Sequence, residues 1–533
     1  MTPSAVAICS DLDAPPIRDR ATTAALYARR AEIVKLPEAQ QAAAYAQLEA
    51  DAAAAGETEL EAAAALSTSV VLRNRDQLTA ADQALQRAYR RASDIRAEGL
   101  AAIALVGRAS IAGRNGDLAG ALSMLKLAVD VADRPEVSPR TRVRIYAGVG
   151  CADRDRGELQ AAVEQLKAAR DLIAKHDLKT GVLELEVRSC LVQSLRGIAG
   201  RGREAVELAR ENVEATIRVS GENSSNHATS LGSLAVSLRN TGDLDAAIAY
   251  DRKALEIMAA TLPPEHSRVL EQRSHLADDL AAAGQFEEAR REYEACLAQY
   301  DRNEALRATP PTLFKGLAEA LRGVGRHDEG IRMFEQAIVE STSQRGKDHP
   351  ATLTYMVMLA GYEIDRGQLD AAARHVAAVE QSCLAHPQLH DARLGTLRRA
   401  VAVELTLARG DPRTAESLAR KALTELADHK SMGQREMLLL VAQSLVAQRR
   451  WADARRVLDQ ALATEAERAK RADIEAGVEL LIAQADYGLG RRTQAIELAR
   501  HARGVLAGFP NQLKARAVAA AFLAKVDRPR GRR

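Results

Sequence analysis

The chain has 533 residues, of which 47% are hydrophobic but only 3% are aromatic. Its 74 basic and 72 acidic residues nearly balance, which excludes an acidic disordered chain and a uniformly basic nucleic-acid binder. The length suggests three or four domains of about 150 residues. However, abundant alanine and only 15 prolines predict helices throughout rather than a few large cores filled by aromatic side chains.

The first segment, residues 1–19, is predicted to be a flexible lead. Its apolar run from Ala5 to Cys9 is five residues long and follows no basic residue, which is too short for a secretory signal. No stretch approaches the roughly 18 apolar residues of a membrane-spanning helix. The five cysteines are scattered, with the closest two 39 residues apart. We therefore expect unpaired, buried cysteines in a soluble, cytoplasmic protein.

A repeat of about 42 residues follows along the chain. Most copies have a small turn residue and, within five residues, an alanine that opens a new apolar face, as in Gly242-Asp-Leu-Asp-Ala-Ala247. Taking the turn residue as position zero gives eleven copies, at Asp76, Gly116, Gly157, Gly200, Gly242, Gly284, Gly325, Gly367, Gly410, Arg449 and Gly490. The residue five positions later is alanine or glycine in every copy. Small side chains let helices approach to about 8 Å, and glycine ends a helix without strain, so each copy predicts a helix hairpin.

The repeats predict an all-α fold, a right-handed α-solenoid of about 11 to 12 helix hairpins. Residues 20–55 are expected to form a degenerate capping hairpin, and residues 56–510 an array of about 11 repeats. A closing helix is expected over residues 511–527 and a disordered basic tail over residues 528–533. The tail suits either contact with an acidic partner or simple solubilisation.

The small residues before and after each turn resemble the tetratricopeptide pattern, stretched from about 34 residues, more than HEAT or armadillo repeats. Gly346-Lys-Asp-His-Pro-Ala-Thr-Leu353 is similar to the connector and first helix of kinesin light chains and their bacterial relatives. Gly232 and Ser233 stand where that family has paired asparagines, so a peptide specificity built on those asparagines is not implied. The whole array resembles the one found C-terminal to many bacterial serine/threonine kinases.

The sequence offers little chemistry. It has no His-Arg-Asp, Asp-Phe-Gly or glycine-rich phosphate loop, so no kinase domain is present in it. Gly148-Val-Gly150 is better explained by helix packing than by phosphate binding. His386 and His390 are four residues apart, but Pro387 separates them and no third ligand is near. We expect no catalytic residue, no cofactor and no metal.

A partner is expected on the inner face of the solenoid, which the first helices of the hairpins line. Inner positions fall near 13, 10, 6 and 3 residues before each turn. In the middle copies they hold Arg239, Glu271, Ser274, Asp278, Lys315, Glu319 and Arg322. This mixed-charge row suits an extended peptide or a helix, and the alternative is a solvated face with intrahelical ion pairs. Farther along the chain, the same positions predict an apolar end of the groove, at Leu439, Val446, Leu480 and Tyr487.

These observations predict a non-enzymatic scaffold that holds a protein or peptide partner in its concave groove. The alternative is the regulatory or sensor arm of a bacterial serine/threonine kinase system, either split from its kinase or acting with a kinase partner in trans. We expect no membrane association, and the lack of interleaved aromatic residues argues against nucleic acid as the partner.

Overall fold

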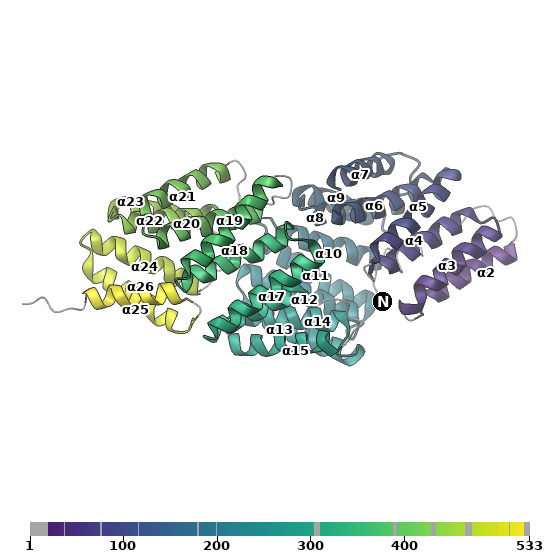
Figure 1. Ribbon diagram of the computed structural model, residues 1–533. Coiled ribbons are helices and arrows are strands. Elements are labelled where there is room, and N and C mark those ends of the chain that lie inside the picture. The colour runs from purple at the N-terminus through teal and green to yellow at the C-terminus, as the bar shows by residue number, and fades with distance from the viewer. Residues whose placement is uncertain are drawn as a thin grey trace, which may run out of the picture. The chain divides into compact units, whose positions relative to one another are not determined.

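The computed structural model describes residues 20–526, apart from residues 37, 75–76, 116, 179–180, 199, 303–309, 387–391, 428–432, 464–471 and 511. The described residues are 85% helical and form 25 helices and no strand (Figure 1). The all-α solenoid of hairpins predicted from the sequence is therefore confirmed. The predicted lead, the predicted tail and His390 lie outside the described residues.

The chain divides into two compact units, Met1–Ser237 and Leu238–Arg533. The helices of the first unit pair in sequence order into hairpins. They are α2 (Arg20–Ile33), α3 (Glu38–Ala54), α4 (Thr58–Asn74), α5 (Leu78–Asp94), α6 (Glu98–Arg114), α7 (Leu118–Ala132), α8 (Pro139–Asp155), α9 (Leu159–Lys175), α10 (Val182–Arg196) and α11 (Gly202–Ser220). Helix α12 (Ser225–Thr241) spans the boundary between the units.

The second unit continues the same pattern and closes with a single helix. Its helices are α13 (Leu244–Thr261), α14 (Ser267–Ala282), α15 (Phe286–Arg302), α16 (Pro311–Gly323), α17 (His327–Arg345), α18 (Pro350–Asp365), α19 (Leu369–Ala385), α20 (Ala392–Ala408), α21 (Pro412–Ala427), α22 (Gln434–Ala447), α23 (Trp451–Ala463), α24 (Ala472–Gly488), α25 (Arg492–Ala507) and α26 (Leu513–Val526). Prolines open α8, α16, α18 and α21, where the missing N–H leaves no helical hydrogen bond unmade.

The turns within the hairpins fall at the predicted positions. Asp76 and Gly116 lie outside the described residues, and the other nine predicted turn residues all have positive φ. Eight of these nine are glycines, which adopt this conformation without strain, and the ninth is Arg449 with φ of 60°. The small residue five positions after each turn is buried in all eleven copies, from Ala81 to Ala495. The predicted register of the repeats is thus confirmed.

Glycines also bring helices together inside the first unit. A Cβ atom at Gly148 would lie 2.6 Å from Val106 Cγ1, and one at Gly150 would lie 2.6 Å from Leu166 Cγ. Such distances are too short for real contacts, so α8 packs against α6 and α9 only because these residues lack a side chain. The packing interpretation of Gly148-Val-Gly150 is confirmed.

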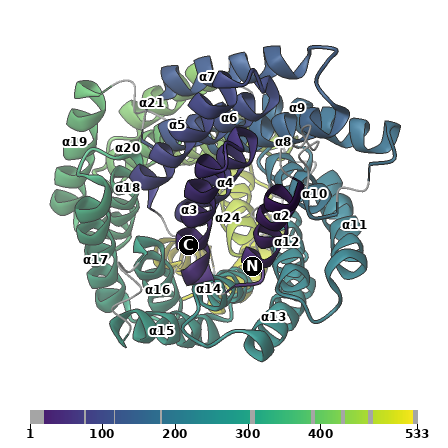
Figure 2. The same ribbon diagram turned by 90° about the vertical axis from the view of Figure 1, so that its right-hand side faces the viewer.

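Within the second unit, the first helices of successive hairpins form one row and the second helices form another. Figure 2 shows α14, α16 and α18 on the inner side of a curve, with α15, α17 and α19 outside them. Helix α14 contacts α16, and α18 contacts α20, whereas α16 and α18 meet through side chains such as Ala318 and Tyr362, which belong to one buried cluster. Side chains on the open face of the inner row are therefore presented side by side.

Two contacts tie the closing end of the second unit to other parts of that unit. The rings of Phe286, at the start of α15, and Phe509, just before α26, meet edge to face with their centroids 6.3 Å apart. Tyr487 of α24 meets Phe522 of α26 at 5.5 Å, and Leu480 is buried in the same cluster as Leu523. Because α26 covers Leu480, the apolar anchor predicted for this end of the groove is wrong at that residue.

Candidate functional site

Two of the predicted partner-binding residues meet at the start of the second unit. Arg239, at the end of α12, forms ion pairs with Asp279 and, at 3.8 Å, with Asp278, both in α14. Tyr293 of α15 donates its hydroxyl proton to Asp278. Arg239 and Asp278, predicted separately from their spacing, therefore lie together, and Asp279 is a buried partner that the prediction missed.

A buried carboxyl pair stands behind this ion pair. Asp251 of α13 and Asp279 are fully buried, and Gln272 Nε2 donates to Asp251 Oδ1 at 2.7 Å. Burial raises the pKa of Asp251, and the nearby Asp279 carboxyl raises it further. Burial also raises the pKa of Asp279, although the Arg239 guanidinium opposes that shift. The pair therefore holds protons more tightly than ordinary aspartates do.

The predicted residues of α16 make two separate contacts. Lys315 Nζ lies 2.7 Å from Glu319 Oε2, an ion pair within one turn of the helix. Arg322 Nη2 reaches the next hairpin, where Asp365 Oδ2 of α18 is 3.0 Å away. The Arg322 guanidinium also lies over the ring of Tyr362, 3.0 Å from its centroid. Lys315 and Glu319 thus form the intrahelical ion pair expected for a solvated face, whereas Arg322 links two hairpins.

The remaining predicted residues lie on α14. Glu271 is exposed and lies two helical turns before Asp278, and Ser274 is half-buried and lies one turn before it. Farther along the inner row, burial raises the pKa of Glu404 in α20 to about 7, although Lys514 of α26 lowers it. We call Arg239, Asp278, Glu319, Arg322 and Asp365 the inner charged row.

A second candidate site lies in the first unit, where we predicted none. A cavity of about 250 Å³ opens between α4, α6, α8 and α10, which are the first helices of four successive hairpins. Its charged lining consists of Arg73, Arg144, Arg154, Asp155 and Glu186. Arg73, Arg144 and Arg154 occupy the same offsets, 3 or 13 residues before a turn, that defined the row in the second unit. The rule would have found them if it had been applied to the earlier copies.

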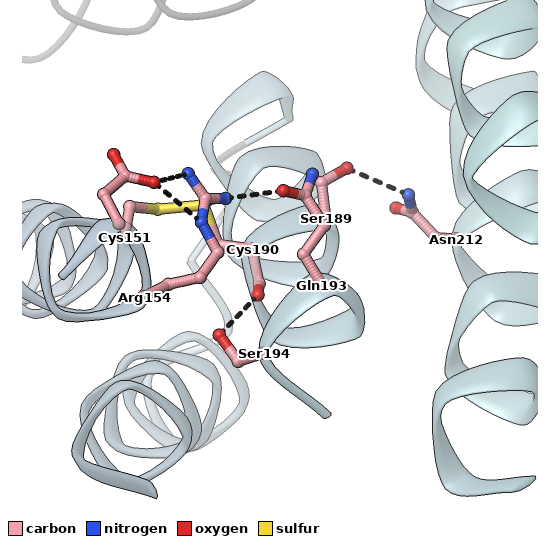
Figure 3. Close-up of a disulfide and its surroundings, with 8 residues drawn as sticks. Cys151, Arg154, Ser189, Cys190, Gln193, Ser194 and Asn212 are labelled. Atoms are coloured by element: carbon pink, nitrogen blue, oxygen red, sulfur yellow. Dashed lines mark hydrogen bonds and ion pairs between the residues drawn. A yellow bond between two sulfur atoms is a disulfide. The ribbon is translucent and has the colours of Figure 1, made fainter. Parts of the chain in front are cut away.

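The electrostatics of this cavity centre on Glu186. Burial raises the pKa of its carboxyl, whereas the guanidinium groups of Arg73, Arg144 and Arg154 lower it, and the net direction is upward. Arg154 donates from Nη1 to Gln193 Oε1 at 2.9 Å and from Nη2 to Asp155 Oδ1 at 2.6 Å (Figure 3). The cavity therefore surrounds one half-buried carboxyl with three cations.

A disulfide forms part of the wall of this cavity. Cys151 of α8 and Cys190 of α10 are joined, with their Cα atoms 5.6 Å apart (Figure 3). Arg154 Nη1 also lies 3.2 Å from Cys190 Sγ. The expectation of unpaired cysteines is therefore wrong for this pair, because a separation of 39 residues is close to one repeat and brings neighbouring first helices side by side. Cys296 and Cys383 are buried thiols, as expected.

The described residues hold no group of three or more His, Cys, Asp or Glu side chains arranged for a metal ion. Within the same part of the chain, no helix is both long and apolar enough to cross a membrane.

Comparison with protein families supports the repeat assignment. The sequence model of the tetratricopeptide repeat family matches residues 186–260 and 310–380. The chain carries tetratricopeptide repeats. The two matched stretches include the first helices α12, α16 and α18, so the inner charged row lies largely on these repeats. A search of curated proteins found no similar sequence.

Solved structures similar to this chain are also repeat proteins. A putative kinesin light chain of Podosopora anserina with nearly identical TPR-like repeats is 24% identical, over 37% of this chain and 94% of that one, with a TM-score of 0.33. BtubC (BKLC) from P. vanneervenii is 22% identical, over 43% and 89%, with a TM-score of 0.35. A Rap protein in complex with competence and sporulation factor is 12% identical, over 88% and 99%, with a TM-score of 0.48.

Proposed function

We propose that this protein is a non-enzymatic scaffold that binds a protein or peptide partner on the inner charged row of its second unit. Tetratricopeptide hairpins place first helices side by side, so that a partner crossing them contacts several helices at once. The observation that carries the proposal is the continuity of the row, in which Arg239 and Arg322 each reach an aspartate of the following hairpin.

The exposure of the row indicates the chemistry of the partner. The side chains of Asp278 and Glu319 are 41% and 34% exposed, whereas those of Arg239 and Arg322 are 22% and 12% exposed. The guanidinium groups therefore lie deeper and the carboxylates remain open to solvent. This arrangement suits a partner segment that carries lysine or arginine side chains, because opposite charges favour encounter and alignment.

The proposal is tested by charge reversal of the exposed carboxylates. The variant Asp278→Lys/Glu319→Lys and wild type would be used for affinity capture from the native cell, with mass spectrometry of the bound proteins. A matched control, Glu256→Lys/Glu288→Lys, makes the same charge change on the second helices α13 and α15, where both side chains are exposed. We expect a partner captured by wild type and by the control but lost with the inner variant. Equal capture by all three proteins would refute the site.

The kinase alternative predicts a particular outcome of the same experiment. If the protein acts as a sensor arm in trans, a serine/threonine kinase should be among the proteins lost with the inner variant. Its activity in a reconstituted assay should then change on addition of wild type but not of that variant. If the partners lost with the inner variant include no kinase, the scaffold function stands and the kinase role is refuted.

A further inference from the structure

The cavity of the first unit has the composition of a binding site for an anionic group. Its three arginines face two carboxyls, Asp155 and Glu186, which leaves one formal positive charge among the described lining residues. Guanidinium groups bind carboxylates and phosphates through paired N–H donors, and they keep their charge when half-buried. A ligand carboxylate that takes the place of the Glu186 carboxyl leaves this charge unchanged, because it is the same chemical group that the arginines already surround.

The rest of the lining limits what can accompany that charge. Leu66, Val70, Val106 and Leu183 contribute apolar walls beside the arginines. The volume of about 250 Å³ corresponds to roughly eight water molecules, enough for one acidic side chain and part of an apolar neighbour but not for a folded element. The occupant that fits is therefore a short peptide segment that presents a carboxylate next to an aliphatic side chain.

Glu186 already places a carboxyl among these arginines. It comes from α10, and burial raises its pKa despite the neighbouring cations Arg73, Arg144 and Arg154. The arginines do not fully offset the cost of burying this carboxyl, so a carboxylate brought by a ligand can replace it among them. The internal carboxyl thus acts as a competitor for the position that a ligand would take.

The disulfide fixes the spacing of the two helices that supply most of the charge. Helix α8 carries Arg144 and Arg154, and α10 carries Glu186, while Cys151–Cys190 joins these helices in the cavity wall. Arg154 is further held by Gln193 on α10. A site whose cations are held in place before binding loses less conformational freedom when a ligand arrives.

We propose that this cavity binds the carboxylate of an acidic peptide segment with an aliphatic neighbour, in exchange for the internal Glu186 carboxyl. The site lies in the first unit and is separate from the inner charged row of the proposed function. Neither proposal depends on the other, because the two sites share no residue.

The test is fluorescence anisotropy of the oxidised full-length chain with labelled peptides. The first probe is a fluorescein-labelled Gly-Leu-Glu-Leu-Gly amide. Two analogues carry glutamine or phosphoserine in place of its glutamate. The fourth probe, Gly-Leu-Gln-Leu, has a free C-terminal carboxylate. We expect the glutamate peptide to bind at least tenfold more tightly than the glutamine amide. Tighter binding of the free acid than of the glutamate peptide would assign the site to a chain terminus, and either result supports a carboxylate site.

Variants separate binding in the cavity from binding elsewhere. Arg144→Gln should weaken binding of the glutamate peptide at least tenfold, whereas Arg203→Gln, at an exposed position on α11, should not. Glu186→Gln should strengthen binding several-fold, a gain that a purely structural role for Glu186 would not produce. Asp278→Lys/Glu319→Lys should leave this binding unchanged, so that failure here is distinguishable from failure of the proposed function.

Three results would overturn the proposal. The first is that neither carboxylate peptide binds saturably to wild type or to Glu186→Gln. The second is that the glutamate and glutamine amides bind equally well. The third is that the phosphoserine peptide binds more tightly than the glutamate peptide and that this binding depends on Arg144. If Arg144→Gln does not fold, as judged by circular dichroism, Arg73→Gln serves in its place with the same expected loss.

Discussion

The two units use the same repeat to present different chemistry on their first helices. In the first unit, three arginines surround the single half-buried carboxyl of Glu186, and a disulfide holds the surrounding helices. In the second unit, Arg239 and Arg322 each pair with an aspartate of the following hairpin, and the more exposed groups are carboxylates. The cavity of the first unit therefore has more positive than negative groups in its lining, whereas the arginines of the inner charged row are paired with aspartates.

The difference shows that the repeat determines where inner side chains lie but not what they do. Arginines 3 or 13 positions before a turn line the cavity of the first unit, and charged residues 3 or 6 positions before a turn form most of the inner charged row of the second. Which groups they contact depends on which charge the next first helix supplies at the adjacent position. A change of one residue per repeat can therefore alter a binding surface without disturbing the small residues that pack the helices.

The largest expected effect concerns the covalent link of the first unit. Cys151→Ser/Cys190→Ser should destabilise this unit by about 4 kcal/mol, the chain-entropy value for a loop of this length. Hydrogen exchange should increase in α8 and α10 but not in α20 or α22. Reductant should shift wild type toward the variant and leave the variant itself unchanged. Equal exchange in wild type and variant would show that packing alone holds these helices.

A smaller effect is expected at the buried carboxyl pair of the second unit. Because the folded-state pKa of Asp251 lies above its unfolded value, the folded chain binds more protons, and stability falls as pH rises above the usual aspartate range. Asp251→Asn removes this charge and keeps an acceptor for Gln272, so we expect a gain on the order of 1 kcal/mol at pH 8.

Chemical denaturation of both proteins at pH 5 and pH 8 measures this effect. Wild type should lose stability between the two values, and the variant should lose less. A variant whose stability falls as steeply as that of wild type would place the titrating group elsewhere.

The smallest effect tests two residues other than glycine that have positive φ, one in a hairpin turn of the second unit and one between two hairpins of the first. Arg449 has a positive φ where most other copies have glycine, and Arg96 has a positive φ at the end of a second helix in the first unit. Arg449→Gly and Arg96→Gly should each stabilise the chain by about 1 kcal/mol, because glycine adopts this conformation without a Cβ clash. Thermal melts of the two variants measure the gain. If only one of the two variants were stabilised, the Cβ clash would be absent at the other position.

The sequence predicted the fold closely because the repeat depends on local chemistry. Glycine at a turn and alanine five residues later act through backbone conformation and helix approach, which can be read from spacing alone. Arg239 and Asp278 were also placed correctly on neighbouring first helices, because their offsets follow from the helical period.

The missed features depend on pairing between copies. The partnership of Cys151 and Cys190 requires positions in adjacent repeats to be compared, whereas a search for closely spaced cysteines compares neighbours in sequence. Asp279 and Asp365 lie one residue from the inner offsets, and the rotamers of Arg239 and Arg322 decide which carboxylate each reaches. The cover over Leu480 depends on where α26 docks, which no period specifies.

The contact between Phe286 and Phe509 changes how the second unit should come apart. A row of hairpins held by neighbours alone frays from its free end, one hairpin at a time. Here the rings of residues 223 positions apart meet, and Phe286 also packs against Gly323 of α16. Loosening α26 would therefore uncover an aromatic side chain five hairpins away. Helix α26 and the hairpin that contains α15 should therefore unfold together, although they are far apart in the sequence.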